Sequence, residues 1–197
     1  MGPPAQAGLH WRDERTCDGM NEPHKPDFGG TDHEAVASHS CASSLREQAL
    51  SHFLLWQLTA ARWRAGRHDL EVLKGEVDRG GYDLVLEAGG VIRHVQLKSS
   101  IVGSAVREVS VSTRLSEKPS GCVIWLEVER STLQLERYLW FGGEPGARLP
   151  ELGSRITRHS RANSRGEKAE RPLHRQLGKS CFEVVRGADE LVSRLFG

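Results

Sequence analysis

Two stretches of the chain repeat hydrophobic positions at helical spacing. Between residues 45 and 60, apolar residues recur three and four positions apart, which predicts a helix with one buried face. Ser44 and Glu47 match a capping box, in which each side chain bonds the backbone of the other residue. This helix is therefore expected to begin at Ser44, run to about Arg64 and end near Gly66. A second helix is predicted at the end of the chain, over ADELVSRLF.

Between these helices, alternating or continuous apolar runs predict strands. Strands are expected over residues 69–74 and 106–113. The run CVIWLEVE, residues 122–129, is rich in β-branched and aromatic side chains and predicts a buried strand. LQLERYLWF, residues 133–141, would return beside it, and CFEVV would add a short last strand. A helix, several strands and a closing helix indicate an α/β sandwich around one mixed sheet.

The stretch YDLVLEAGGVIRHVQLK, residues 82–98, predicts a β-hairpin whose register is set by its Gly-Gly pair. A two-residue turn needs positive φ, which glycine adopts freely. In that register Asp83 faces Gln96, and Lys98 lies two residues further on the same face. The other face would be apolar and would carry Tyr82, Leu84, Leu86, Val95 and Leu97. The polar side chains would therefore form one cluster.

Length and cysteine usage restrict the class of protein. The 197 residues fit one medium domain with an attached tail. No apolar run reaches about 18 residues, so no membrane span is expected, and the first residues lack a signal-peptide pattern. Four widely separated cysteines without CxxC spacing argue against a zinc site and a disulfide framework. A cytoplasmic location is expected.

Charge divides the chain into unlike regions although the net charge is only +1. Residues 1–42 are polar, Gly- and Pro-rich and without periodicity, which predicts a disordered N-terminal tail before a single domain over 43–197. Residues 148–186 hold ten Lys or Arg against four Glu. A basic segment at 154–180 is therefore expected to bind nucleic acid, through Arg155, Arg158, Arg161, Arg165, Lys168, Arg171 and Arg175. The alternative is a solvated, mobile loop.

The polar cluster of the hairpin suits phosphodiester hydrolysis. The Asp83 carboxylate and the Gln96 amide oxygen can share a hard cation such as Mg²⁺, with the Leu97 carbonyl as a third oxygen. The Lys98 ammonium can stabilise a metal-bound hydroxide or a phosphate oxygen. The alternative is a plain surface ion pair between Asp83 and Lys98, worth at most about 1 kcal/mol.

The spacing D-x(12)-Q-x-K, after a helix that carries a Glu, resembles the PD-(D/E)xK phosphodiesterase superfamily, the restriction-endonuclease-like nucleases. The resemblance covers roughly residues 44–128 and rests on YDLVLE and HVQLKSS. Tyr82 stands where the superfamily usually has Pro. Gln96 stands where it usually has an acid, a variant that the superfamily tolerates.

The resemblance implies a restriction-endonuclease-like sandwich, with a central mixed sheet flanked by helices. It implies that Asp83 and Gln96 hold Mg²⁺ or Mn²⁺ and that Lys98 assists the attacking water. Because glutamine is neutral, a further acid is needed, and Glu47 is the natural supplier. Capping of the helix is the alternative role for Glu47. Glu71 and Glu76 are weaker candidates.

Three functions follow in order of preference. The first is a metal-dependent endonuclease acting on nucleic acid, with DNA expected. The second is a nuclease-like module that binds nucleic acid but has lost the chemistry. The third is an unrelated α/β interaction domain. No membrane partner is expected, and a homodimer stays open because many members of the superfamily cut as dimers.

Overall fold

The computed structural model describes residues 32–75, 80–159, 166 and 168–197. The chain divides into two compact units, Met1–Ser38 and His39–Gly197, and all described strands belong to the second. Residues 1–31 of the predicted disordered tail lie outside the described residues, so disorder there stays a prediction.

The first helix, α1 (Asp32–Arg64), ends where it was predicted to end but begins earlier. The prediction of a start at Ser44 is therefore wrong, and residues 32–42 are helical rather than tail. A capping box is a local pattern, and within a longer helix the preceding turn already bonds the backbone. The Ser43 hydroxyl instead donates to the Glu47 carboxylate over 3.5 Å. The last helix, α2 (Ala188–Phe196), has the predicted bounds.

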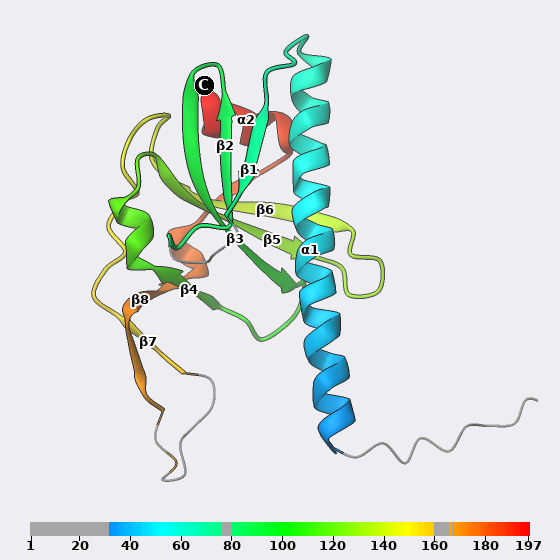
Figure 1. Cartoon of the computed structure of the whole chain (residues 1–197), viewed down its shortest axis with the longest axis vertical. Coiled ribbons are helices and arrows are strands. Elements are labelled where there is room, and N and C mark those ends of the chain that lie inside the picture. The colour runs from blue at the N-terminus through cyan, green and yellow to red at the C-terminus, as the bar shows by residue number, and fades with distance from the viewer. Residues whose placement is uncertain (1–31, 76–79, 160–165, 167) are drawn as a thin grey trace, which may run out of the picture. The chain divides into compact units, whose positions relative to one another are not determined.

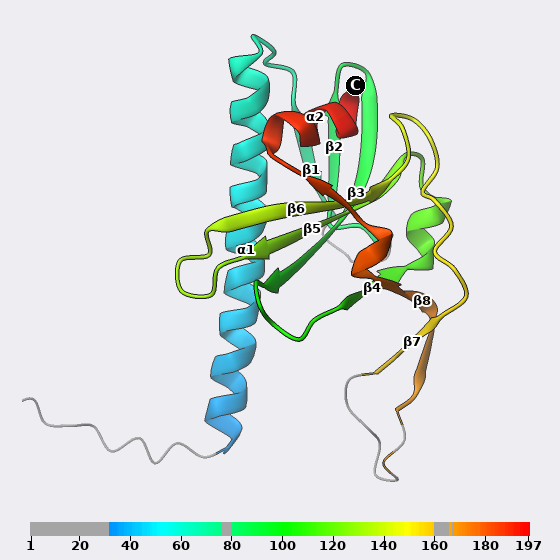
Figure 2. The ribbon, with the colours of Figure 1, turned by 180° about the vertical axis from the view of Figure 1, so that it is seen from behind.

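Six strands form the main sheet, in the order β1-β2-β3-β5-β6-β9. They are β1 (Glu71–Lys74), β2 (Leu84–Ala88), β3 (Val91–Ile101), β5 (Gly121–Val128), β6 (Leu135–Gly142) and β9 (Glu183–Val185). β3 and β5 are parallel, and the other neighbours are antiparallel, so the sheet is mixed as predicted. Figures 1 and 2 show this sheet from both sides.

A second, antiparallel sheet has the order β4-β8-β7. It consists of β4 (Glu108–Ser112), β7 (Ile156–Arg158) and β8 (Glu170–Gly178), with the 3₁₀ turns η1 (Thr113–Glu117) and η2 (Lys179–Cys181) beside it. β7 and β8 come from the basic segment, where no strand was predicted. The described part of that segment therefore contributes two strands to a sheet.

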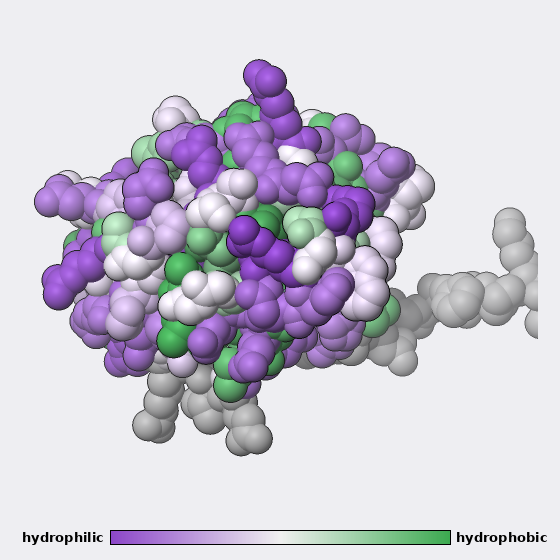
Figure 3. Space-filling model, turned by 90° about the horizontal axis from the view of Figure 1, so that it is seen from above, coloured by the Kyte–Doolittle hydropathy of each residue, from purple (hydrophilic) through white to green (hydrophobic). Residues whose placement is uncertain are grey.

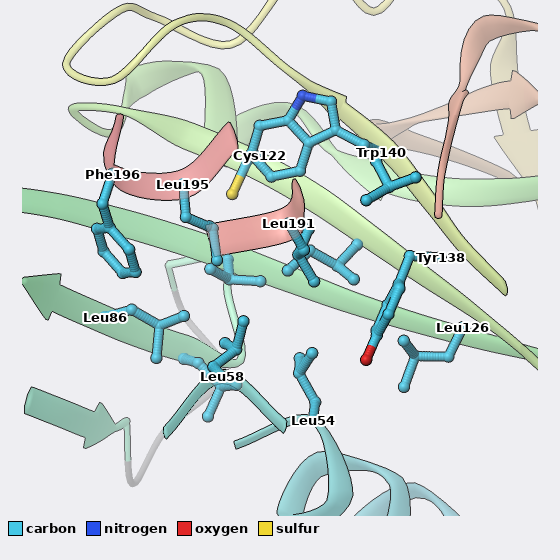
Figure 4. Packing of buried hydrophobic residues seen from close by; sticks show 14 of the residues in the cluster. Leu54, Leu58, Leu86, Cys122, Leu126, Tyr138, Trp140, Leu191, Leu195 and Phe196 are labelled. Carbon is cyan, nitrogen blue, oxygen red and sulfur yellow. The ribbon is translucent and has the colours of Figure 1, made fainter. Parts of the chain in front are cut away.

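Alternate residues of β5 face opposite sides of the main sheet, and each side has its own core. On one side, Cys122, Ile124 and Leu126 pack against leucines of both α1 and α2. Figure 4 shows Leu54 and Leu58 of α1 converging on this cluster together with residues of α2. Burial of such side chains stabilises by roughly 1.5–3 kcal/mol each.

The second side of the main sheet is covered by the small sheet. Val123 and Trp125 of β5 pack there against Val109 and Val111 of β4 and Leu177 of β8. The predicted α/β class, a central mixed sheet flanked by helices, is confirmed. Both helices lie on one face, and the small sheet covers the other.

Buried Arg93 holds α2 against the hairpin. Its guanidinium donates to the backbone carbonyls of Leu195 over 2.7 Å and Arg194 over 2.8 Å. Carbonyls in the last turn of a helix lack partners within the helix, so a cation there satisfies them. A core position of β3 is thus occupied by a charged residue.

Seen from above, the surface is mainly hydrophilic, with small separate hydrophobic patches (Figure 3). Among the described helices, none has the length and hydrophobicity needed to cross a membrane.

Candidate active site

The hairpin of β2 and β3 has the predicted register along the full length of β2. Ala88 pairs with Val91 and Leu84 pairs with Val95. Gly89 and Gly90 have φ of 59° and 77°, as a two-residue turn of type I′ requires. The Gly-Gly pair therefore sets the pairing of the two strands.

The ladder becomes irregular at Asp83, one residue before β2. The Asp83 N–H donates to the carbonyl of Val95 over 2.8 Å, although Val95 already pairs with Leu84. A β-bulge is the arrangement in which two residues of one strand lie opposite a single residue of the neighbouring strand. The predicted direct pairing of Asp83 with Gln96 is therefore not formed.

The bulge changes which faces the neighbouring side chains occupy. Leu84 packs in the core under α1, whereas Tyr82 packs against the core under the small sheet. Its ring meets His94 edge-on at a centroid distance of 4.9 Å. The expectation that Tyr82 shares a face with Leu84 is wrong, because an extra residue interrupts the alternation.

The Asp83 carboxylate is exposed and fixed by the backbone of β3. The Leu97 N–H donates to Asp83 Oδ2 over 2.6 Å. The side chain thus occupies the place that the carbonyl of a neighbouring strand would have in a regular ladder. This bond orients the carboxylate just before β2 begins, where β3 extends past its pairing with β2.

Gln96 lies on the other face of the main sheet and is buried, with only 7% of its surface exposed. Its Oε1 accepts a hydrogen bond from the Ser112 N–H over 3.2 Å. β3 and β5 run in register, and Gln96 aligns with Val123, which packs under the small sheet. The structure therefore does not bring the Gln96 amide together with the Asp83 carboxylate.

A groove of about 460 Å³ opens between α1 and the strands β1, β2 and β3. Its charged and central lining residues are Arg46, Glu47, Lys74, Asp83, Leu97 and Lys98. The groove is lined by three of the four predicted catalytic residues, Glu47, Asp83 and Lys98. Lys98 aligns with Trp125 and therefore leaves β3 on the face that Gln96 occupies, so it lines the groove where β3 extends past β2. Leu97, predicted to supply a carbonyl, also lines it.

The packing of α1 places Glu47 in the groove. Leu50, Leu54 and Leu58 follow at four-residue spacing and are fully buried against the sheet. Residues three positions apart share a helix face, so Glu47 lies one turn before Leu50 on the side that meets the sheet. The side chain stays exposed because the main core does not reach that far along the helix.

The donor set suits a small hard cation. Mg²⁺ takes one or two carboxylates and keeps several waters. Glu47 and Asp83 provide two exposed carboxylates on facing elements of the groove. Within the described ranges, no group of three or more His, Cys, Asp or Glu residues is arranged for a metal. Glu71 lies on the edge strand outside the lining, and Glu76 lies outside the described residues.

The basic segment is partly neutralised by carboxylates. Arg155 pairs with Glu108 over 2.7 Å, and Arg158 pairs with Glu170 over 3.5 Å. With Lys168 these residues line a polar hollow of about 630 Å³ on the outer side of the small sheet. The remaining predicted contact residues are Arg171 and Arg175, which lie on β8, and Arg161 and Arg165, which lie outside the described residues.

Two of the lining residues, Arg46 and Lys74, were not predicted from the sequence. Arg46 precedes Glu47, and Lys74 ends the predicted first strand. Neither belongs to the D-x(12)-Q-x-K spacing. The signal that could have found Arg46 is its position one helical turn before the buried Leu50.

Comparison of the chain with known proteins assigns it to no family. No protein-family model matches the chain, and no curated protein matches it. Among solved structures, the chain is similar to a bacterial homing endonuclease, I-Ssp6803I, with 22% sequence identity and a TM-score of 0.27. The match covers 52% of this chain and 62% of that chain, less than two thirds of its length. A TM-score of this size does not establish a shared fold.

Proposed function

We propose that this protein is a metal-dependent endonuclease that hydrolyses phosphodiester bonds of nucleic acid, with DNA as the substrate. The observation that carries the proposal is the groove in which Glu47 of α1, Asp83 at the start of β2 and Lys98 of β3 meet. Two carboxylates and an ammonium from three different elements are the groups that this chemistry needs. The resemblance of the motif also implied these three residues, together with Gln96.

In this proposal the carboxylates of Glu47 and Asp83 hold Mg²⁺ or Mn²⁺. The bound cation supplies a polarised phosphate oxygen and a water of lowered pKa. The Leu97 N–H keeps the Asp83 carboxylate oriented toward the groove. The Lys98 ammonium stabilises the negative charge that develops on the phosphate.

Gln96 receives a positioning role rather than a ligand role. Its buried amide accepts the Ser112 N–H and so ties β3 to the end of β4. β3 also carries Lys98, which lines the groove. Loss of this bond would therefore disturb the strand that supplies the ammonium.

The basic segment supports a polyanionic substrate. Arg155, Arg158 and Lys168 gather on the outer side of the small sheet. Arginine stays charged and binds phosphate through two parallel hydrogen bonds. Such contacts bind a nucleic-acid backbone without reading its sequence.

A plasmid-nicking assay with Mg²⁺ or Mn²⁺ tests the proposal. Asp83→Asn and Lys98→Ala should each abolish metal-dependent nicking while the circular dichroism spectrum stays that of the wild type. The matched control is Glu71→Gln, which removes an exposed carboxylate outside the groove and should retain full activity. Undiminished nicking by both groove variants would overturn the assignment.

A second function, a module that binds nucleic acid without cleaving it, is favoured by the placement of Gln96. Its amide oxygen accepts a hydrogen bond from the Ser112 N–H, which leaves two carboxylates where three side-chain ligands were expected. Calorimetry with Mn²⁺ separates the two functions. Binding that disappears in Asp83→Asn supports the enzyme, and the absence of Mn²⁺ binding to the wild type supports the inactive module.

A further inference from the structure

The groove holds more positive charge than the motif accounts for. Arg46 from α1 and Lys74 from β1 line it together with Lys98. Two carboxylates and three cations therefore line one depression. A site that held a cation alone would be weakened by neighbouring positive charge, so the extra cations call for an anionic ligand.

Arg46 is directed into the groove by the same helical face as Glu47. It lies four residues before buried Leu50, and residues four apart lie one above the other on a helix. Its side chain is half-buried rather than fully solvated. The guanidinium thus extends from the α1 wall close to where Glu47 stands.

Lys74 reaches the groove from the opposite wall. It is the last residue of β1 and pairs with Leu84, the residue after Asp83. Paired residues on neighbouring strands point to the same face, and Leu84 is buried on the α1 side. The Lys74 ammonium is therefore on that side too, beside Asp83, and it is exposed.

Neither cation is engaged within the described part of the chain. Arg46 and Lys74 make no ion pair and no side-chain hydrogen bond with a described residue. Arg155, by contrast, is held by the Glu108 carboxylate. The charges of Arg46 and Lys74 are thus available to a ligand, whereas Arg155 must first exchange a protein partner.

We infer that Arg46 and Lys74 bind backbone phosphate groups next to the phosphodiester that is cleaved, so that the substrate strand crosses the groove from α1 to β1. The inference rests on the proposed function, because it takes the carboxylates of the same groove as the cleavage point. It adds two binding residues that lie outside the motif and outside the basic segment. The ligand is a nucleic-acid strand recognised through its phosphates.

Fluorescence anisotropy with a short labelled DNA duplex, without divalent metal, tests the inference in the Asp83→Asn background. Adding Arg46→Ala or Lys74→Ala should weaken binding about tenfold each, and should lower the slope of log affinity against log salt by about one each. Arg46→Lys and Lys74→Arg keep the charge and should recover most of the affinity. Arg67→Ala is the matched control, since Arg67 is exposed beyond the far end of the same helix.

The steady-state parameters KM and kcat give a second test of the two phosphate contacts. In the wild-type background, Arg46→Ala and Lys74→Ala should raise KM and change kcat little, because phosphates beside the cleaved one are bound alike before and during reaction. A structural role would instead lower the thermal stability and would affect both parameters.

The outcomes separate this inference from the proposed function. If affinity and salt slope stay unchanged in both Ala variants, the inference is overturned even where the wild type nicks DNA. If only one of the two Ala variants binds DNA more weakly, the inference is overturned for the other residue. If both variants weaken binding but the wild type never cleaves, the two phosphate contacts stand and the endonuclease proposal fails.

Discussion

The backbone N–H of Leu97 donates a hydrogen bond to the carboxylate of Asp83 over 2.6 Å. The bond exists because the ladder of β2 and β3 is displaced at Asp83, whose own N–H donates to Val95. The regular register would have put the Asp83 side chain opposite Gln96. The bulge puts it instead where β3 extends past the end of its pairing with β2, within the groove that Glu47 also lines.

Substitutions of Asp83 should separate its structural role from its chemical one. Asp83→Asn keeps an oxygen acceptor for the Leu97 N–H, so the free energy of unfolding should change by no more than about 0.5 kcal/mol. Asp83→Ala removes the acceptor and should cost about 1 kcal/mol. Both should lose Mn²⁺ binding. Urea unfolding at pH 7 measures the first difference, and an Ala variant as stable as the Asn variant would show that the hydrogen bond contributes nothing.

Substitution of Gln96 tests whether this residue binds the metal ion or only positions β3. Gln96→Glu keeps an oxygen for the Ser112 N–H, so the protein should fold, and its Mn²⁺ affinity should match that of the wild type. A ligand at this position would bind the cation more tightly once charged, so a clear gain in affinity by calorimetry would contradict the positioning role.

Gln96→Leu complements this test. It leaves the buried Ser112 N–H without its acceptor and should cost about 1–3 kcal/mol in urea unfolding. Its matched control is Gln134→Leu, at the exposed turn before β6, where little loss is expected. Equal free energies of unfolding for the two variants would show that the hydrogen bond between Ser112 and Gln96 does not stabilise the fold.

The hairpin was predictable because its register depends on a local feature. Gly89 and Gly90 adopt the positive φ that a two-residue turn needs, and each pair from Ala88 to Leu84 follows from that turn. The strand over CVIWLEVE and the bounds of α2 were predictable for a similar reason, since the strand is a continuous run rich in β-branched and aromatic residues and the helix has local periodicity. Local patterns thus gave most of the main sheet.

Features that depend on distant contacts were not predictable. The start of α1 was placed at Ser44 because a capping box carries no information on what precedes it. The bulge at Asp83 depends on a bond to β3, and the burial of Gln96 depends on a small sheet formed partly by β7 and β8. Arg46 and Lys74 meet only because α1 packs beside β1. The structure therefore groups Glu47, Asp83 and Lys98 in one groove and adds Arg46 and Lys74 to them, whereas Gln96 lies outside it.

The ion pairs of the small sheet should restrain binding to DNA. Glu108→Gln and Glu170→Gln release Arg155 and Arg158 and remove negative charge beside them. Each should tighten DNA binding a few-fold, because exposed ion pairs are worth only about 0.2–1 kcal/mol. Filter binding at several salt concentrations measures the change, with Glu71→Gln as a control outside the segment. Weaker binding by either Gln variant would mean that the carboxylates orient the arginines for DNA.

The arginines themselves are tested by the salt dependence of DNA binding. Replacement of Arg158, Arg161 and Arg165 by Ala should flatten the slope of log affinity against log salt, because each phosphate contact releases a counterion. Arg186→Ala, which lies outside the segment, is the control and should leave the slope unchanged. The same slope in the triple variant as in the wild type would remove the segment from the nucleic-acid contacts.

Lys179 belongs to the basic segment by sequence but stabilises the interior. Its ammonium lies 2.5 Å from Oε1 of Glu127, which is 2% exposed, and 5.1 Å from the Trp125 ring. Arg137 contacts the other oxygen of Glu127. Burial by itself raises the pKa of Glu127, but the hydrogen bonds and charges of Lys179 and Arg137 outweigh it, so the pKa lies below its ordinary value.

Lys179→Met should therefore lower the free energy of unfolding by about 3 kcal/mol at pH 7, because it leaves a buried carboxylate with one partner instead of two. Glu127 has a lowered folded-state pKa, so its contribution is present above the unfolded value of 4.5 and is lost as the pH falls through the folded value. The stability difference between wild type and Lys179→Met should accordingly shrink as the pH is lowered below 4.5. Urea unfolding from pH 7 to pH 3 measures it, with the exposed Lys168→Met as the control. A difference that stays constant across this range would show that the Glu127 charge does not stabilise the fold.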